Sequence, residues 1–236
     1  MKPTWKSASR EIRSLANPRQ AGFLMGFFKT GKGEYGEGDR FLGLKVPQVR
    51  AVARAYLDLS WRDLDRLVRS PYHEERLLAL VIVADRAARA PDTATRKACY
   101  AFYVGHMKWI NNWDLVDVTA GKVVGAWLWD HPRGVLFTWA RSTRLWDRRV
   151  AVLATSHFIA RGRFNETIRL SRLLLNDRED LMHKAVGWML REVGKRDDKV
   201  LLKFLDRHAG VMPRTMLRYA VEKLPKKTRL GYMALR

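Results

Sequence analysis

The stretch that decides the fold is residues 178–195, Arg-Glu-Asp-Leu-Met-His-Lys-Ala-Val-Gly-Trp-Met-Leu-Arg-Glu-Val-Gly-Lys. Apolar side chains recur in it every three or four positions, the spacing of one face of an α-helix, at Met182, Val186, Met189 and Val193. Trp188 lies outside this apolar stripe, beside Lys184 and Arg191. The pattern therefore predicts an amphipathic helix that carries a tryptophan on its basic side.

The same period runs through the rest of the chain. It predicts helices near 4–15, 18–30, 47–57, 60–69, 74–90, 92–105, 112–128, 133–142, 146–161, 164–175, 178–195, 197–209 and 213–224. Typical helix-start residues mark several of these boundaries, namely Pro47, Ser60, Asp177 and Pro213. No alternating run is long enough to predict a strand. Short helices joined by short polar turns favour antiparallel neighbours, so we expect an all-α fold.

The predicted helices also repeat along the chain. Residues near successive helix starts stand 38, 35, 35 and 31 positions apart, at Arg76, Asp114, Arg149, Lys184 and Thr215. This interval is the length of one helical hairpin. It predicts an α-solenoid of HEAT-like antiparallel helix pairs, forming a single domain over 1–236, with a concave basic face made from one helix of each pair.

Composition indicates the class of partner. The chain has 45 Lys and Arg against 24 Asp and Glu, a net charge of +21, and a surface of this charge suits a polyanion such as nucleic acid. The single cysteine, Cys99, allows no intramolecular disulfide. Neither a signal peptide nor a membrane span is predicted. We expect a cytoplasmic monomer that makes no membrane contact.

The sequence lacks the usual signatures of metal and phosphate sites. The histidines are scattered, and no Cys or His spacing is typical of zinc. The glycine-rich residues Gly31–Gly38 fit neither the P-loop nor the Rossmann pattern, and we expect a flexible connection there. The sequence therefore predicts neither a metal nor a cofactor.

The segment Asn112-Trp113-Asp114-Leu115-Val116-Asp117 is the strongest candidate for chemistry. Trp113 and Asp117 are four positions apart, so in a helix they point to the same side. In the repeat register Trp113, Arg149, Asp117 and Trp188 fall at offsets −1, 0, +3 and +4, a sector about 140° wide. If the register holds, three repeats place these side chains on one wall.

Each of these residues also has a structural explanation. Trp188 could pack against a neighbouring repeat instead of stacking on a nucleotide. Asp117 could cap a helix or pair with Arg149. The cations near the same wall, Arg148, Arg149, Lys184, Arg191, Arg214 and Arg218, could simply form a solvated face. We expect most of the other tryptophans in the core, namely Trp5, Trp61, Trp127, Trp129, Trp139 and Trp146.

Four segments together resemble the bacterial AlkD-type DNA alkylation repair glycosylases, which are built from HEAT-like repeats. In family order they are Phe41-Leu42-Gly43-Leu44-Lys45-Val46-Pro47, Asn112 to Asp117, Trp146-Asp147-Arg148-Arg149-Val150-Ala151 and Lys184 to Glu192. The resemblance implies that Asp117 is the catalytic aspartate, that Trp113 and Trp188 are the cleft tryptophans and that Arg149 is the cleft arginine. Some members have tryptophan where this chain has Asn112.

The implied activity is that of a monofunctional glycosylase that acts on double-stranded DNA containing alkylated bases. It would hydrolyse the N-glycosidic bond of positively charged 3-alkyladenine or 7-alkylguanine in base excision repair. The implied DNA-binding cations are Arg148, Lys184, Arg191, Arg214, Arg218 and Lys45. An alkylated purine is already cationic and leaves without protonation, so one carboxylate can replace the usual glycosidase pair.

Three other interpretations compete with this one. A non-catalytic HEAT-repeat protein that binds nucleic acid would use Asp117 for structure only. A protein acting on structured RNA would carry a similar charge. A protein-interaction scaffold is the commonest use of such repeats, but the charge of +21 argues against it.

Overall fold

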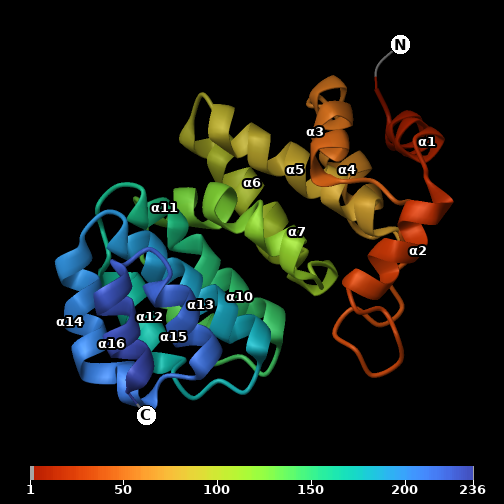
Figure 1. Ribbon diagram of the computed structural model, residues 1–236. Coiled ribbons are helices and arrows are strands. Elements are labelled where there is room, and N and C mark those ends of the chain that lie inside the picture. Colours follow the sequence, from red (N-terminus) through yellow and green to blue (C-terminus); the bar gives the residue numbers. More distant parts are fainter. Residues whose placement is uncertain (1–2, 236) are drawn as a thin grey trace. The chain divides into compact units, whose positions relative to one another are not determined.

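The computed structural model describes residues 3–235, and its regular structure is helical (Figure 1). Across those residues there is no strand, and one isolated bridge pairs Arg40 with Tyr72. The helices form two compact units, unit 1 (Met1–Val123) and unit 2 (Val124–Arg236). The predicted all-α class is confirmed, while the prediction of a single repeat domain with a concave basic face stays a prediction.

Unit 1 is organised around one long helix. Its elements are α1 (Trp5–Ser14), α2 (Pro18–Phe27), α3 (Val46–Ala55), α4 (Trp61–Val68), α5 (His73–Arg89), α6 (Thr93–Gly105), the 3-10 helix η1 (Met107–Trp109) and α7 (Trp113–Asp117). The helices α1, α3, α4, α6 and α7 all pack against α5. Every residue of α5 from Leu77 to Ala84 is buried, because this helix is surrounded by its neighbours and has no solvent face there.

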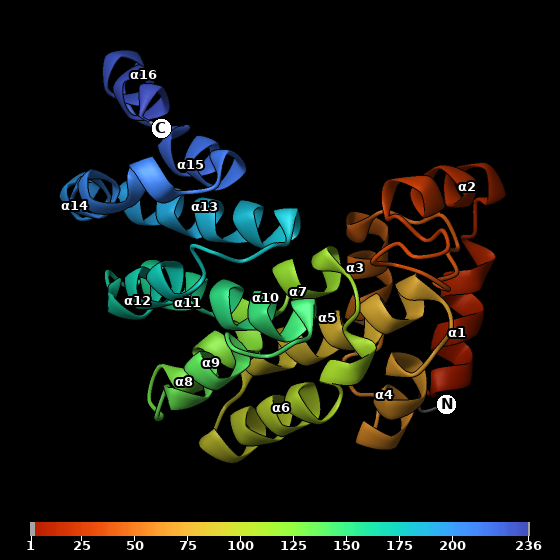
Figure 2. The same cartoon turned by 90° about the horizontal axis from the view of Figure 1, so that it is seen from below.

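Unit 2 consists of stacked helix pairs. Its elements are α8 (Ala126–Leu128), α9 (Gly134–Trp139), α10 (Leu145–Ala154), α11 (Ser156–Ile159), α12 (Asn165–Leu173), α13 (Asp180–Gly194), α14 (Asp198–His208), η3 (Ala209–Val211), α15 (Arg214–Val221) and α16 (Lys226–Ala234). The inner helices α10, α13 and α15 pack side by side, and α12, α14 and α16 cover them (Figure 2). This arrangement is typical of an α-solenoid.

Most predicted helix starts are confirmed. The Ser60 hydroxyl accepts a hydrogen bond from the backbone N–H of Asp63 at 3.1 Å, Pro47 lies in the first turn of α3, and Pro213 precedes α15. The prediction for Asp177 is wrong, because its carboxylate accepts from the N–H of Glu179 and α13 begins only at Asp180.

Other expectations need correction. The sequence analysis missed α16, which buries none of its residues and so has no apolar stripe to reveal it. Trp146 is buried as expected, but Trp61 is 38% exposed and lies under the guanidinium of Arg86. The other four tryptophans expected in the core are only partly buried, namely Trp5, Trp127, Trp129 and Trp139. The glycine-rich connection is held by hydrogen bonds, since Glu34 and Glu37 accept from backbone N–H groups within it.

A buried carboxylate fixes the segment that leads into α3. Glu74 accepts hydrogen bonds from the backbone N–H groups of Leu42, Gly43 and Leu44, at 2.8, 2.8 and 3.1 Å. Gly43 has φ +91° and lies against the backbone of Asn17, so a side chain there would be strained and would collide. The conformation of this segment therefore depends on both residues.

The only cysteine lies inside unit 1. Cys99 is fully buried on α6. Burial raises the pKa of its thiol, and the charge of Arg86 offsets only part of this effect. The thiol is consequently protonated at neutral pH.

The inner helices of unit 2 approach closely at one glycine. A Cβ atom added to Gly187 on α13 would lie 2.6 Å from Cβ of Tyr219 and closer still to the carbonyl oxygen of Met216, both on α15. The absence of a side chain at Gly187 thus sets the distance between the two helices.

Gly187→Ala should lower the free energy of unfolding by about 1–3 kcal/mol, because the added methyl group must push α15 away from α13. Gly22→Ala is the matched control, since Gly22 lies within α2 and has open space around it. The control should be neutral or stabilising by about 0.5–1 kcal/mol. Urea denaturation measures both variants, and equal stability of Gly187→Ala and wild type would contradict the close approach.

Candidate active site

The central segment of the candidate site is a short helix in unit 1. The five residues of α7 are followed by a turn and the π-helix η2 (Gly121–Gly125), so the continuous helix predicted over 112–128 is wrong. The Thr119 hydroxyl donates to the carbonyl of Leu115. This bond is of the kind that bends helices, and it accounts for part of the interruption.

Trp113 and Asp117 occupy the two ends of α7, one helical turn apart, as their spacing predicted. Both side chains are only partly buried. The negative charge of Asp117 also acts on the buried Tyr103: burial raises the pKa of that phenol, and the carboxylate raises it further. Asp117 is therefore close enough to the core to influence its electrostatics while remaining partly accessible.

The ring of Trp113 is held by an aromatic cluster. It stacks on Phe28, with ring centroids 4.9 Å apart and planes 15° apart, and meets the edge of Phe27 at 5.9 Å. Phe28 in turn stacks on Phe41 at 5.0 Å, within a cluster that includes Leu24. Packing thus explains the orientation of Trp113, and the same packing keeps part of the ring available.

A buried network of charges lies beneath the start of α7. His73 bonds through Nε2 to Asp114 at 2.8 Å and through Nδ1 to Asp39 at 3.3 Å. Arg76 pairs with Asp39 at 2.7 Å, and its other contacts include Asn111 at 3.0 Å. Asn111 closes the network by donating to Asp39 at 2.8 Å. Two cations and two carboxylates therefore balance one another away from water.

The network sets the charge of its histidine. Burial alone would lower the pKa of His73, but the charge and hydrogen bond of Asp114, with the hydrogen bond of Asp39, raise it to about 9. Burial would raise the pKa of Asp39, but His73 and Arg76 hold it below its ordinary value. The sequence analysis missed this network, because Asp39 and Asp114 lie 34 and 41 positions from His73.

In unit 2 the predicted cleft arginine is a buried residue of α10. Arg149 is 4% exposed, and its guanidinium donates to the carbonyl oxygen of Leu181. Its neighbour Arg148 pairs with Asp177 at 2.7 Å and donates to the carbonyls of Ser142 and Thr143. These contacts give Arg148 a structural role in joining α10 to the segment before α13.

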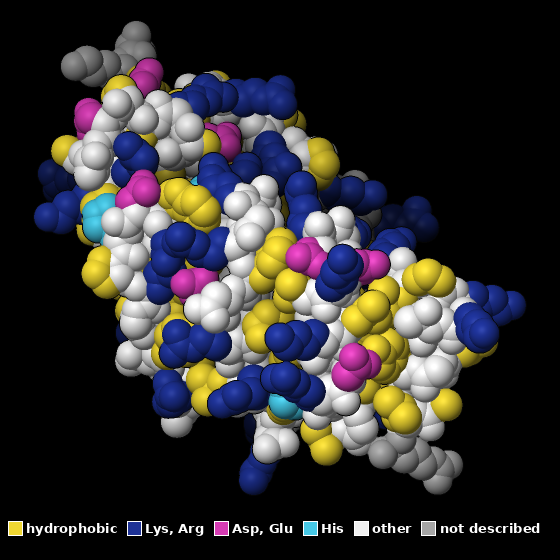
Figure 3. All heavy atoms as spheres, turned by 90° about the vertical axis from the view of Figure 1, so that its left-hand side faces the viewer, with side chains coloured by type: hydrophobic (Ala, Val, Ile, Leu, Met, Phe, Trp, Pro, Cys, Tyr) yellow, Lys and Arg dark blue, Asp and Glu magenta, His cyan; other side chains and the backbone are white. Residues whose placement is uncertain are grey.

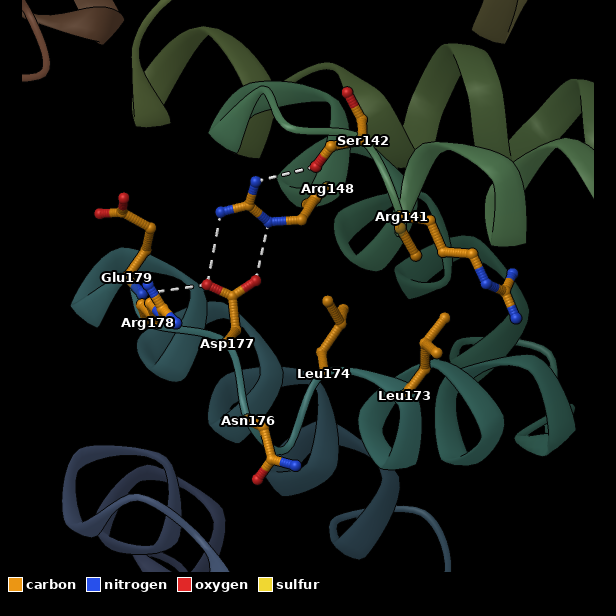
Figure 4. Close-up of a pocket in the computed structure, with 10 residues that line it drawn as sticks. Arg141, Ser142, Arg148, Leu173, Leu174, Asn176, Asp177, Arg178 and Glu179 are labelled. Atoms are coloured by element: carbon orange, nitrogen blue, oxygen red, sulfur yellow. Dashed lines mark hydrogen bonds and ion pairs between the residues drawn. The ribbon is translucent and has the colours of Figure 1, made fainter.

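Arg148 also borders an open hollow in unit 2 (Figure 4). Asp177, Arg178 and Glu179 line it on one side, and Arg141 and Leu174 line it on another. The Arg148–Asp177 pair spans part of the wall, as the dashed lines in Figure 4 show. The hollow carries charges of both signs, with three arginines against two carboxylates.

Trp188 lies on α13 within a mixed cluster of charges. It is partly buried, and its indole N–H donates to Glu192 at 3.2 Å. Glu192 also binds Lys195 at 2.7 Å and the Arg191 guanidinium at 3.5 Å. Arg191 is further held by Glu222 of the segment after α15. The face around Trp188 is therefore less basic than the sequence indicated.

The remaining predicted DNA contacts differ in accessibility. Lys184 pairs with Asp180 at 2.8 Å, and Arg214 donates to the carbonyl oxygens of Met233 and Leu235 at 2.7 and 3.2 Å. Arg218 on α15 and Lys45, just before α3 in unit 1, are exposed. The predicted meeting of the unit 1 residues with those of unit 2 stays a prediction.

Among residues 3–235, no group of three or more His, Cys, Asp or Glu side chains is placed to hold a metal ion. No helix in the described part of the chain has both the length and the apolar character needed to cross a bilayer.

Comparison with known proteins identifies the family. The family model described as "DNA alkylation repair enzyme" matches residues 8–224, which is most of the chain. The chain belongs to this family. The match includes the helix with Trp113 and Asp117 as well as the α10, α13 and α15 segments.

Structural comparison agrees with the family assignment. A solved structure titled "Predicted DNA alkylation repair enzyme from Enterococcus faecalis" superimposes with a TM-score of 0.68 at 19% sequence identity. The superposition covers 89% of this chain and 97% of that one. At this identity the likeness shows the fold alone. No curated protein matches the sequence.

The buried network predicts an unusual pH dependence of stability. The pKa of His73 is about 9 in the folded protein against 6.5 ordinarily, so its stabilising effect is complete below pH 6.5 and is lost as the pH rises through 9. Over that interval, wild type should lose about 1–3 kcal/mol more stability than His73→Gln. Denaturation of both proteins from pH 6 to 10 measures this, and parallel pH curves would show that His73 is not held as a cation.

Proposed function

We propose that this member of the DNA alkylation repair enzyme family is a monofunctional DNA glycosylase. It excises positively charged alkylpurines, 3-alkyladenine and 7-alkylguanine, from double-stranded DNA as a monomer. The observation that carries the proposal is the pair on α7, where Trp113 and Asp117 stand one turn apart and partly exposed. The buried network, which includes Asp114 of α7, holds in place the helix that carries Trp113 and Asp117.

The proposed chemistry needs one carboxylate. An N3- or N7-alkylated purine carries a positive charge, so its glycosidic bond is weakened and the base leaves without an added proton. The Asp117 carboxylate would stabilise the positive charge that develops on the deoxyribose and would position the attacking water. The bond from the sugar carbon to the purine nitrogen breaks, and water supplies the hydroxyl that replaces the base.

The tryptophans would supply selectivity for charge. A cationic nucleotide beside Trp113 or Trp188 would gain about 0.5–2 kcal/mol from each cation–π contact, which a neutral base would not. The stacking of Trp113 on Phe28 supports this role, because a ring already held in place loses little freedom on binding. Arg149 would hold a phosphate through its guanidinium, which in this structure donates to the carbonyl oxygen of Leu181.

The alternative is a non-catalytic HEAT-repeat protein that binds nucleic acid. It is favoured by the internal contacts of the candidate residues, since Trp113 packs on Phe28, Trp188 bonds to Glu192 and Arg149 bonds to Leu181. In that case the same side chains would serve the fold alone.

Asp117→Asn separates the two functions, because it removes the negative charge and keeps the size of the side chain. Excision of methylated purines from alkylated duplex DNA should fall at least tenfold, while the affinity for the same duplex should stay near that of wild type. Release of free base, measured by chromatography, is the assay. Retention of more than a tenth of the wild-type rate, or no excision by wild type, would refute the catalytic assignment.

A second experiment concerns the class of glycosylase. Enzymes that also nick the strand attack the sugar with an amine and form a Schiff base. Lys184 is the amine in the predicted wall, but it is paired with Asp180 at 2.8 Å, and its hydrogen bond lowers the pKa of that carboxyl.

We therefore expect an intact abasic strand as the product and no covalent complex after borohydride reduction. Gel electrophoresis of the reduced reaction detects such a complex. A trapped adduct that disappears in Lys184→Ala would replace the hydrolytic mechanism with one based on the amine.

A further inference from the structure

The free positive charge of unit 2 does not lie mainly on the predicted wall. There Arg148, Lys184 and Arg191 each form an ion pair, and Arg214 is held by two backbone carbonyls. A guanidinium or ammonium that is already paired has less to gain from a phosphate. Arg218 on α15 is exposed, and further exposed cations lie on the outer helix α14.

The helix α14 carries a stripe of such cations. Lys199, Lys203 and Arg207 follow one another at intervals of four residues and are all exposed. The opposite side of α14 is buried through Leu201 and its neighbours Phe204 and Leu205. Successive cations therefore rise by about 6 Å along one solvent face of the helix. Within residues 3–235 no carboxylate lies within ion-pair distance of these three side chains.

Burial and the charges of Arg172 on α12 and Arg207 on α14 lower the pKa of His208, the last residue of α14. The adjacent carboxylate, Asp206, is bound by the hydroxyl of Tyr232 on α16 instead of by Arg207. We call Lys199, Lys203 and Arg207 the outer basic stripe.

Figure 3 shows this side of the molecule. On the face drawn there, dark blue Lys and Arg side chains are more widespread than magenta Asp and Glu side chains. The inner helices α10, α13 and α15 lie on the other side of α12 and α14, because α13 packs against both. The outer basic stripe is thus separate from the predicted wall.

We propose that the outer basic stripe is a second DNA-binding surface, which holds the phosphate backbone of a DNA segment other than the one at the candidate active site. The 6 Å steps are close to the spacing of successive phosphates along one strand, because each rise of about 3.4 Å along the duplex axis is accompanied by a turn about that axis. The net charge of +21 and the match to the DNA alkylation repair family favour DNA over an acidic protein segment as the occupant of the stripe. With two surfaces, one protein molecule can bridge two duplexes.

The test compares two triple variants that remove equal charge. Lys199→Gln/Lys203→Gln/Arg207→Gln removes the stripe, and Arg10→Gln/Arg50→Gln/Arg54→Gln removes three exposed cations from α1 and α3 of unit 1. Melting temperatures check that both variants fold, and single Lys203→Gln gives a milder version of the first. Bridging is measured by energy transfer between unalkylated 20-base-pair duplexes labelled separately with donor and acceptor. Binding of one labelled duplex and excision from alkylated duplex are measured in parallel.

Wild type and the unit 1 variant should bridge the duplexes, whereas the stripe variant should lose at least fivefold of the bridging signal. Its binding of a single duplex should change by less than threefold. Absence of bridging by wild type would overturn the inference, and so would an equal loss in both variants or unchanged bridging in the stripe variant. The last result would leave an acidic protein as the partner of the stripe.

A large loss of single-duplex binding would also overturn the inference, because the stripe would then be the primary site. Failure of the proposed glycosylase activity is a separate result: wild type would then bridge duplexes without releasing any base.

Discussion

The structure of unit 1 depends on the ion pair between the buried carboxylate of Asp114 and His73. Asp114 is 4% exposed, and a carboxylate at that depth needs a cation, which His73 provides at 2.8 Å. The same imidazole binds Asp39, and Asp39 binds Arg76. Removing one member of such a set leaves an uncompensated charge that costs about 3–5 kcal/mol. The four residues therefore form the network together, and they tie the connection before α3, the helix α5 and the start of α7 to one another.

The parts that follow from local spacing were predictable. Helix period gives the all-α class, and the four-residue interval between Trp113 and Asp117 places both on one side of α7. Interactions between distant positions were not predictable, because nothing in the sequence near His73 indicates Asp39 or Asp114. Nor could the end of α7 be foreseen, since part of the interruption comes from Thr119, beyond α7, whose hydroxyl donates back to the carbonyl of Leu115. Arg149 and Trp188 belong to unit 2 and α7 to unit 1, so neither the spacing within a helix nor the contacts within one unit place these two residues beside α7.

Net charge predicts the chemical class of the partner, but it does not predict where on the protein surface that partner binds. The excess of cations is a property of composition, whereas the cations left for binding depend on which carboxylates lie nearby. On α13, Arg191 is held by Glu222, a residue 31 positions later that only the packing of α15 brings close. On α14, Lys203 meets no such residue among those described. A binding surface inferred from charged residues in the sequence must therefore be revised once the ion pairs within the protein are known.

The interior position of Cys99 has a consequence for a protein that belongs to the alkylation repair family. The thiolate, and not the thiol, is the nucleophile that electrophiles attack. With the side chain fully buried and its pKa raised, this sulfur is both shielded and protonated. The only thiol of the chain is thus kept from the methylating agents that damage DNA, so in the folded protein Cys99 resists modification by the same chemicals whose lesions its family repairs.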